Sequence, residues 1–176
     1  MRKFCQVKAL VFACLVSVAS PACAQSLTAP LSGVGFLVGT WSSGSGVVSD
    51  TGGTSKGDSA ITAEAGGAAL LRRDHTDLFD AKGRRTCGFD QIMLIYPEAG
   101  TLHADYSDGQ HVIHYTSATV TPGKTVVFTS AIGAGPTFRL SYDLQSPDTL
   151  AVSFAMQPPG QAAFKPIAAG TLKKAS

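Results

Sequence analysis

The fold is decided by residues 137–157, which read TFRLSYDLQSPDTLAVSFAMQ. Apolar residues stand at every second position on both sides of a Ser-Pro-Asp turn, and they are Phe138, Leu140, Tyr142, Leu144, Leu150, Val152, Phe154 and Met156. A period of two places alternate side chains on opposite faces of a strand. The segment therefore predicts two antiparallel strands joined by a hairpin, with one apolar face.

Turn chemistry recurs through the rest of the chain at similar spacing. Gly, Pro, Asp and Ser gather at 50–53, 65–67, 80–83, 97–100, 107–109, 122–123, 133–136, 146–148 and 158–160. The segments between them predict about ten strands. These strands are expected to begin near Thr40, Lys56, Ala68, Thr86, Thr101, Gln110, Lys124, Pro136, Thr149 and Ala162. A short helical turn is expected over residues 31–37, before the first strand.

Short connections favour an up-and-down meander, and such a sheet must close to protect its edge strands. We therefore predict an all-β protein that forms a single up-and-down antiparallel β-barrel of about ten strands. No other fold class is indicated, because helical periodicity is weak after residue 37.

The N-terminal segment has the three parts of a secretory signal peptide. Arg2, Lys3 and Lys8 precede an apolar run over 9–19, and Ala22-Cys23-Ala24 is a small-x-small cleavage pattern. The run is too short to span a bilayer, and no later segment is a membrane-helix candidate. We predict a signal peptide over 1–24, a barrel domain over 25–176, and a periplasmic or secreted location.

Charge and cysteine content narrow the function classes. The chain has 14 Lys+Arg and 12 Asp+Glu, and loss of the three basic residues of 1–24 leaves 11 against 12, a net charge of −1. This balance lacks the basic face that nucleic acid requires, so no nucleic-acid partner is predicted. Cys87 is the one cysteine after residue 24, and it is interpreted as a small buried hydrophobe in a strand.

Several short stretches resemble those of a known protein family. Residues 36–41, FLVGTW, followed by Gly44 and Gly46, resemble the opening of lipocalin-like (calycin) barrels. The stretches MLIYP (93–97), ADY (104–106) and HVIHY (111–115) are similar to exported bacterial lipocalin-like proteins of unknown function. The resemblance implies that Trp41 is a structural plug at one end of the barrel and that Gly39 gives the chain room to turn.

The same resemblance suggests what the interior could hold. Nitrobindin-like haem barrels place an iron-ligating His near the C-terminal strand, but no His follows His114 here, so neither haem nor another cofactor is predicted. Fatty-acid-binding barrels hold a carboxylate with interior Arg and Tyr. The candidate ligand-binding residues of suitable chemistry are Arg73, His75, Tyr96, Tyr106, His111, His114, Tyr115, Arg139 and Tyr142.

The sequence does not decide on which strand face several of these candidates lie. Arg139 alternates with Phe138 and Leu140, which suggests the outer face if those two point inward. Arg73, His75 and Asp77 share one strand face, and a cavity wall or an exposed face explains them equally well.

The histidines predict neither a metal site nor a catalytic one. His111 and His114 are three apart, which places them on opposite strand faces, so no shared metal is predicted. No nucleophile elbow or phosphate loop occurs, and no catalytic residue is assigned. Asp105, Asp108 and His111 surround one hairpin and are the best candidates for a carboxylate–histidine pair.

These observations favour non-catalytic binding of a small apolar or amphipathic molecule inside the barrel. The first alternative is a small barrel enzyme that uses His111 or His114 as acid-base. The second is an envelope interaction module without ligand, which requires a barrel packed solid with bulky side chains.

Overall fold

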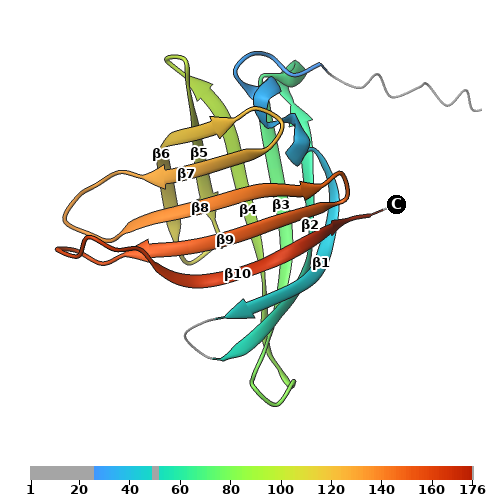
Figure 1. Ribbon diagram of the computed structural model, residues 1–176, viewed down its shortest axis with the longest axis vertical. Coiled ribbons are helices and arrows are strands. Elements are labelled where there is room, and N and C mark those ends of the chain that lie inside the picture. The colour runs from blue at the N-terminus through green and yellow to red at the C-terminus, as the bar shows by residue number, and fades with distance from the viewer. Residues whose placement is uncertain (1–25, 49–51, 176) are drawn as a thin grey trace, which may run out of the picture.

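The computed structural model describes residues 26–48 and 52–175, and these form a closed barrel of ten antiparallel strands (Figure 1). The strands are β1 (Gly39–Val48), β2 (Gly53–Glu64), β3 (Ala69–Phe79), β4 (Arg85–Glu98), β5 (Thr101–Ser107), β6 (Val112–Thr121), β7 (Thr125–Ser130), β8 (Thr137–Ser146), β9 (Thr149–Gln157) and β10 (Lys165–Lys174). Each pairs with its chain neighbour, and β1 pairs with β10. The predicted up-and-down barrel is confirmed, and every strand begins within three residues of its expected start.

The predicted signal peptide, residues 1–24, lies outside the described residues. No helix in the described part of the chain is long and apolar enough to cross a membrane.

A short 3₁₀ turn covers one end of the barrel. This turn, η1 (Leu31–Leu37), coincides with the predicted helical turn and lies across the strand ends in Figure 1. Leu31, Val34 and Leu37 are fully buried because they point down into the barrel. The turn is tied to the β6–β7 hairpin, where the Gly123 N–H donates to the Gly33 carbonyl at 2.9 Å. The hydrophobic face of η1 therefore closes this end, which we call the η1 end.

Trp41 stands directly beneath η1 at the start of β1. Its indole is fully buried, and its Nε1–H donates to the Leu37 carbonyl at 2.8 Å. The ammonium of Lys174, from the paired end of β10, lies 5.4 Å from the Trp41 ring centroid. Gly39 has a φ of +139°, a backbone conformation that glycine adopts without steric cost. Trp41 thus couples the covering turn to the barrel wall.

The core lies next to the η1 end. The inward positions there carry bulky apolar side chains that leave little space, and they include Ile61, Leu70, Met93, Ile95, Val126, Phe128 and Leu150. The outward positions of the same strands are more exposed and mix polar residues such as Thr62 and Arg73 with apolar ones such as Ile92 and Leu94.

The interpretation of Cys87 as buried is wrong. Cys87 is exposed, together with the rest of the segment from Arg85 to Gly88. The reason is that the β3–β4 hairpin extends beyond the barrel at the end opposite η1 (Figure 1), where neither face of the strand meets a core.

Candidate functional site

A cavity of about 380 Å³ lies inside the barrel on the side away from η1. Its volume is within the range typical of small-molecule sites. The wall is mainly apolar, and its larger apolar side chains include Leu78, Phe89, Ile113, Leu140, Val152 and Phe154. The lining also includes Val48 and Leu78, from strand ends opposite η1, so the cavity extends toward that end.

The cavity exists because the inward positions of three adjacent strands carry small residues. Gly46 and Gly57 line it from β1 and β2, and Ala168 and Gly170 line it from β10. Since side chains fill the interior of a small barrel, small residues at inward positions leave space for a ligand.

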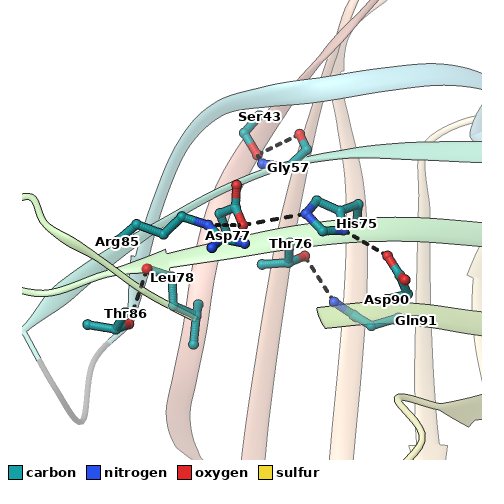
Figure 2. Close-up of polar contacts among 10 residues, drawn as sticks. All are labelled: Ser43, Gly57, His75, Thr76, Asp77, Leu78, Arg85, Thr86, Asp90 and Gln91. Carbon is teal, nitrogen blue, oxygen red and sulfur yellow. Dashed lines mark hydrogen bonds and ion pairs between the residues drawn. The ribbon is translucent and has the colours of Figure 1, made fainter. Parts of the chain in front are cut away.

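The pairing of β1 with β2 is also interrupted beside the cavity. Their register shifts between Ser42 and Val47. The Ser43 hydroxyl compensates by donating to the Gly57 carbonyl at 3.0 Å and accepting from the Gly57 N–H at 2.7 Å (Figure 2). The wall is therefore irregular here, and the Ser43 side chain satisfies the backbone N–H and carbonyl of Gly57.

A buried ion pair forms the polar part of the cavity. Arg72 is 7% exposed and lines the cavity with Asp74 from the same inward face of β3. The Arg72 Nε–H donates to Asp74 Oδ2 at 2.6 Å, and Nη2 also contacts this oxygen. Buried charges require such compensation, because an isolated charge in an apolar interior is very unfavourable.

The remaining donors of Arg72 are also engaged. Nη1 donates to the Tyr142 hydroxyl and lies 3.6 Å from the Met93 sulfur, and Nη2 donates to Gln91 Oε1 at 3.2 Å. Burial lowers the pKa of Arg72, but Tyr142 and Asp74 together outweigh burial and raise it. The guanidinium is therefore permanently charged and held in one orientation.

Gln91 extends the network across the cavity wall. Its Nε2 donates to the Thr76 hydroxyl at 2.9 Å, between β4 and β3 (Figure 2). One carboxylate oxygen of the cluster is left over, because buried Asp74 Oδ1 has no hydrogen-bond partner among the described residues.

Three tyrosines complete the polar side of the cavity. Tyr106, Tyr115 and Tyr142 all line it, from β5, β6 and β8. Burial raises the pKa of each hydroxyl, so all three are neutral at physiological pH. The Tyr106 hydroxyl lies 3.4 Å from Asp108 Oδ2, at the β5–β6 hairpin. These three predicted residues are brought together, and their role in ligand binding stays a prediction.

Four other predicted residues point away from the interior, so the structure does not bring them into the cavity. They are Arg73, Tyr96, His114 and Arg139, each on the outward alternate of a strand whose inward neighbours are buried. Arg139 is exposed and stacks its guanidinium 3.6 Å from the Phe164 ring centroid. Tyr96 and His114 instead hydrogen-bond Asp105 on the outer face, at 3.1 Å and 2.6 Å.

His75 also has its side chain on the outer face. Its Nδ1 lies 2.7 Å from Asp90 Oδ1 and its Nε2 lies 3.4 Å from Asp77 Oδ1 (Figure 2). Arg85 donates to the same Asp77 oxygen at 2.6 Å. His75 and Asp77 belong to an outer hollow beside β1, and His75 also borders the cavity.

His111 lies at the β5–β6 hairpin near the cavity. Its Nδ1 is 3.1 Å from Asp108 Oδ2, so the predicted carboxylate–histidine pair does form. The imidazole is well exposed and is not part of the cavity lining. Within the described residues no three His, Cys, Asp or Glu side chains gather in a way that could hold a metal.

Comparisons with known proteins show the fold and no family. The sequence matches no protein-family model, and no curated protein matches it. The structure is similar to that of Rv2717c from M. tuberculosis, with a TM-score of 0.59 and 15% identity over 86% of this chain and 100% of the other. A likeness at this identity shows a shared fold alone.

Two other solved structures are more distant. The S-type phycobiliprotein lyase CPES from Guillardia theta has a TM-score of 0.49 and 11% identity, covering 80% of this chain and 89% of the lyase. A DUF3598-family protein of unknown function from Nostoc punctiforme has a TM-score of 0.32 and 8% identity, covering 85% and 100%.

Proposed function

We propose that this protein is exported and that its barrel binds a small, largely apolar molecule in the cavity beside Arg72. The observation that carries the proposal is the combination of a cavity of about 380 Å³, mainly apolar walls and one buried polar cluster around the fully hydrogen-bonded guanidinium of Arg72. Ligand sites characteristically combine an apolar lining with a few fixed polar groups. A barrel that serves only as an interaction module has no need of an interior space.

The apolar walls would supply most of the binding free energy. Each Å² of apolar surface removed from water contributes roughly 25 cal/mol, less the entropy lost on association. The polar cluster would orient the ligand, because its groups are already held in place by one another before the ligand arrives. Such preorganisation lowers the entropic cost of binding.

The enzyme alternative has less support from the geometry. The His111–Asp108 pair is exposed at the hairpin and the His114–Asp105 pair lies on the outer face. Neither imidazole lines the cavity, so neither is placed to exchange a proton with a molecule bound inside.

A matched pair of substitutions tests the binding proposal. Ala168 and Ala169 are neighbours on β10 and both border the cavity, but only the Ala168 side chain points into the barrel, opposite Phe154, whereas Ala169 is exposed and pairs with exposed Ser153. Ala168→Phe should fill the cavity and abolish binding of a neutral fluorescent probe, N-phenyl-1-naphthylamine. Ala169→Phe should leave probe binding unchanged. Equal binding by both variants, or none by the unsubstituted protein, would refute an interior site.

Export and natural cargo can be tested in one preparation. The full chain is expressed in a bacterial host, the periplasmic fraction is recovered, and native mass spectrometry gives the mass of the intact complex. We expect a chain that begins at Gln25 and carries an adduct that disappears on denaturation. A chain that retains residues 1–24 in the cytoplasmic fraction would contradict export.

A further inference from the structure

We propose that the polar end of the ligand is an uncharged hydrogen-bond donor, such as an alcohol or an amide, and not a carboxylate. This inference rests on the proposed function, because it concerns the same cavity. It follows from which hydrogen-bonding groups around Arg72 are already used and which are left free.

Arg72 has no donor left for a ligand. A guanidinium has five N–H groups. Here two meet Asp74 Oδ2, and the other three meet the Tyr142 hydroxyl, the Met93 sulfur and the Gln91 amide oxygen. A ligand carboxylate would have to displace one of these partners, so Arg72 does not act as a carboxylate clamp.

Among the described residues, the one group of the Arg72 cluster that is free to bind a ligand is a hydrogen-bond acceptor, the second carboxylate oxygen of Asp74. Asp74 lines the cavity, its side chain is 11% exposed, and its Oδ1 has no partner in the described part of the protein. An unsatisfied buried acceptor is unfavourable, because it has lost its hydrogen bonds to water and gained none in the protein. Since the terminal torsion of a carboxylate is broad, a small rotation turns Oδ1 toward a donor in the cavity. A ligand N–H or O–H would remove this cost.

A tyrosine hydroxyl can hold the other side of the same head group. Tyr115 is 2% exposed, and its neighbours include Arg72, Tyr106 and Tyr142. A phenol can both donate and accept. An alcohol or amide head group could therefore donate to Asp74 and accept from Tyr115.

Charge excludes ionised head groups. Arg72 and Asp74 neutralise each other, so a ligand charge placed beside them would have no counter-charge in a poorly solvated site. A carboxylate would also face Asp108, the acidic residue next to Tyr106. An ammonium group that reached Asp74 would lie next to the guanidinium of Arg72.

The test is a competition series of ligands that share one alkyl chain. Decanol, decanamide, decanoate and decylammonium are titrated against the protein loaded with N-phenyl-1-naphthylamine, and displacement gives each dissociation constant. We expect decanol and decanamide to bind at least tenfold more tightly than either ion. Decanoate or decylammonium as the tightest competitor would overturn the inference.

Asp74→Asn provides the decisive variant. It keeps the shape of the side chain but leaves the charge of Arg72 without compensation, so decanoate should gain at least tenfold and overtake decanol. If this variant does not fold, Tyr115→Phe is used, and it should weaken decanol and decanamide severalfold while the probe binds as before. An unchanged order of affinities in a folded variant would also overturn the inference.

The outcomes separate the two proposals. If the probe does not bind the unsubstituted protein, the proposed function fails. If the probe binds and is displaced best by decanoate, the cavity is a binding site and only the assignment of its head group is wrong.

Discussion

The two halves of this barrel are built from the same ten strands but differ in what their inward positions hold. Next to η1, the inward side chains are Met93, Ile95, Phe128 and other bulky residues, and they are completely buried. Away from η1, the corresponding positions of β1, β2 and β10 hold glycine, serine and alanine, and a cavity results. Side-chain size at inward positions, and not strand number, separates the packed half from the hollow half.

The two halves also differ in the polar groups that they hold inside the barrel. The packed half satisfies its one indole N–H with a backbone carbonyl of η1. The hollow half keeps a charged pair and three tyrosines in its wall. This arrangement contributes little net stability, because desolvation offsets the attraction within a buried ion pair. The polar cluster is therefore better explained by ligand recognition than by folding.

The largest effect is expected in the packed half. Trp41→Ala removes a fully buried indole and its bond to Leu37, and should lower the free energy of unfolding by about 3–5 kcal/mol. Denaturant unfolding measures this loss. It is followed by far-UV circular dichroism, because Trp41 is the one tryptophan of the chain and the variant therefore has no tryptophan fluorescence. Val112→Ala, at an exposed outer position, is the control and should change stability by less than about 0.5 kcal/mol. A loss below 1 kcal/mol for Trp41→Ala would mean that the η1 end is not the core of the fold.

The second effect concerns the ion pair. Arg72→Met leaves Asp74 buried without its counter-charge and should destabilise the protein by about 3 kcal/mol, the lower end of the range for breaking a buried pair. The double variant Arg72→Met, Asp74→Leu should recover most of that loss while it changes the head-group preference of the cavity. Denaturant unfolding of both variants measures this. A double variant as unstable as the single one would show that the cluster stabilises the fold itself.

The third effect compares one substitution in both halves. Ala104 is fully buried on β5 in the packed half, so Ala104→Leu should overpack the core and cost about 2 kcal/mol. Ala168→Leu points into the cavity and should change the free energy of unfolding by less than about 0.5 kcal/mol. Thermal unfolding of the two variants, side by side, measures the difference. Equal costs would mean that the cavity does not exist in solution.

The alternation of residues 137–157 was sufficient to predict β8 and β9, because a period of two is unambiguous there, and the regular spacing of turns predicted the other strands and the barrel. The alternation also suggested the outer face for Arg139, which is where the side chain lies. The helical turn at 31–37 also lies where the sequence predicts it. The burial of Trp41 was implied by the resemblance of residues 36–41 to the opening of lipocalin-like barrels.

The polar centre of the cavity could not be predicted in this way. On β3 the sequence LLRRDHTD, residues 70–77, presents residues of similar character in pairs, so a period of two fits either face. Pairing with β2 and β4 decides that Arg72 and Asp74 face inward and Arg73 and His75 face outward. The sequence does carry one signal for the hollow side, which is the alternation of Gly and Ser at inward positions of β2, Gly53, Ser55, Gly57 and Ser59.

The smallest effect is expected on the outer face of β3, where His75 and Asp90 form an ion pair with none of the burial of Arg72 and Asp74. The hydrogen bond to Asp90 is the main cause that raises the pKa of His75 above its ordinary value near 6.5. A raised pKa means that the pair stabilises the folded state below about pH 6.5 and that this contribution is lost as the pH rises through the His75 pKa. Because both side chains are exposed, solvent screens the pair and the change in stability should be close to the limit of measurement. NMR titration of the His75 ring protons gives the pKa directly. Asp90→Asn should lower the pKa more than Asp77→Asn does, and a pKa unmoved by Asp90→Asn would show that the outer pair does not form in solution.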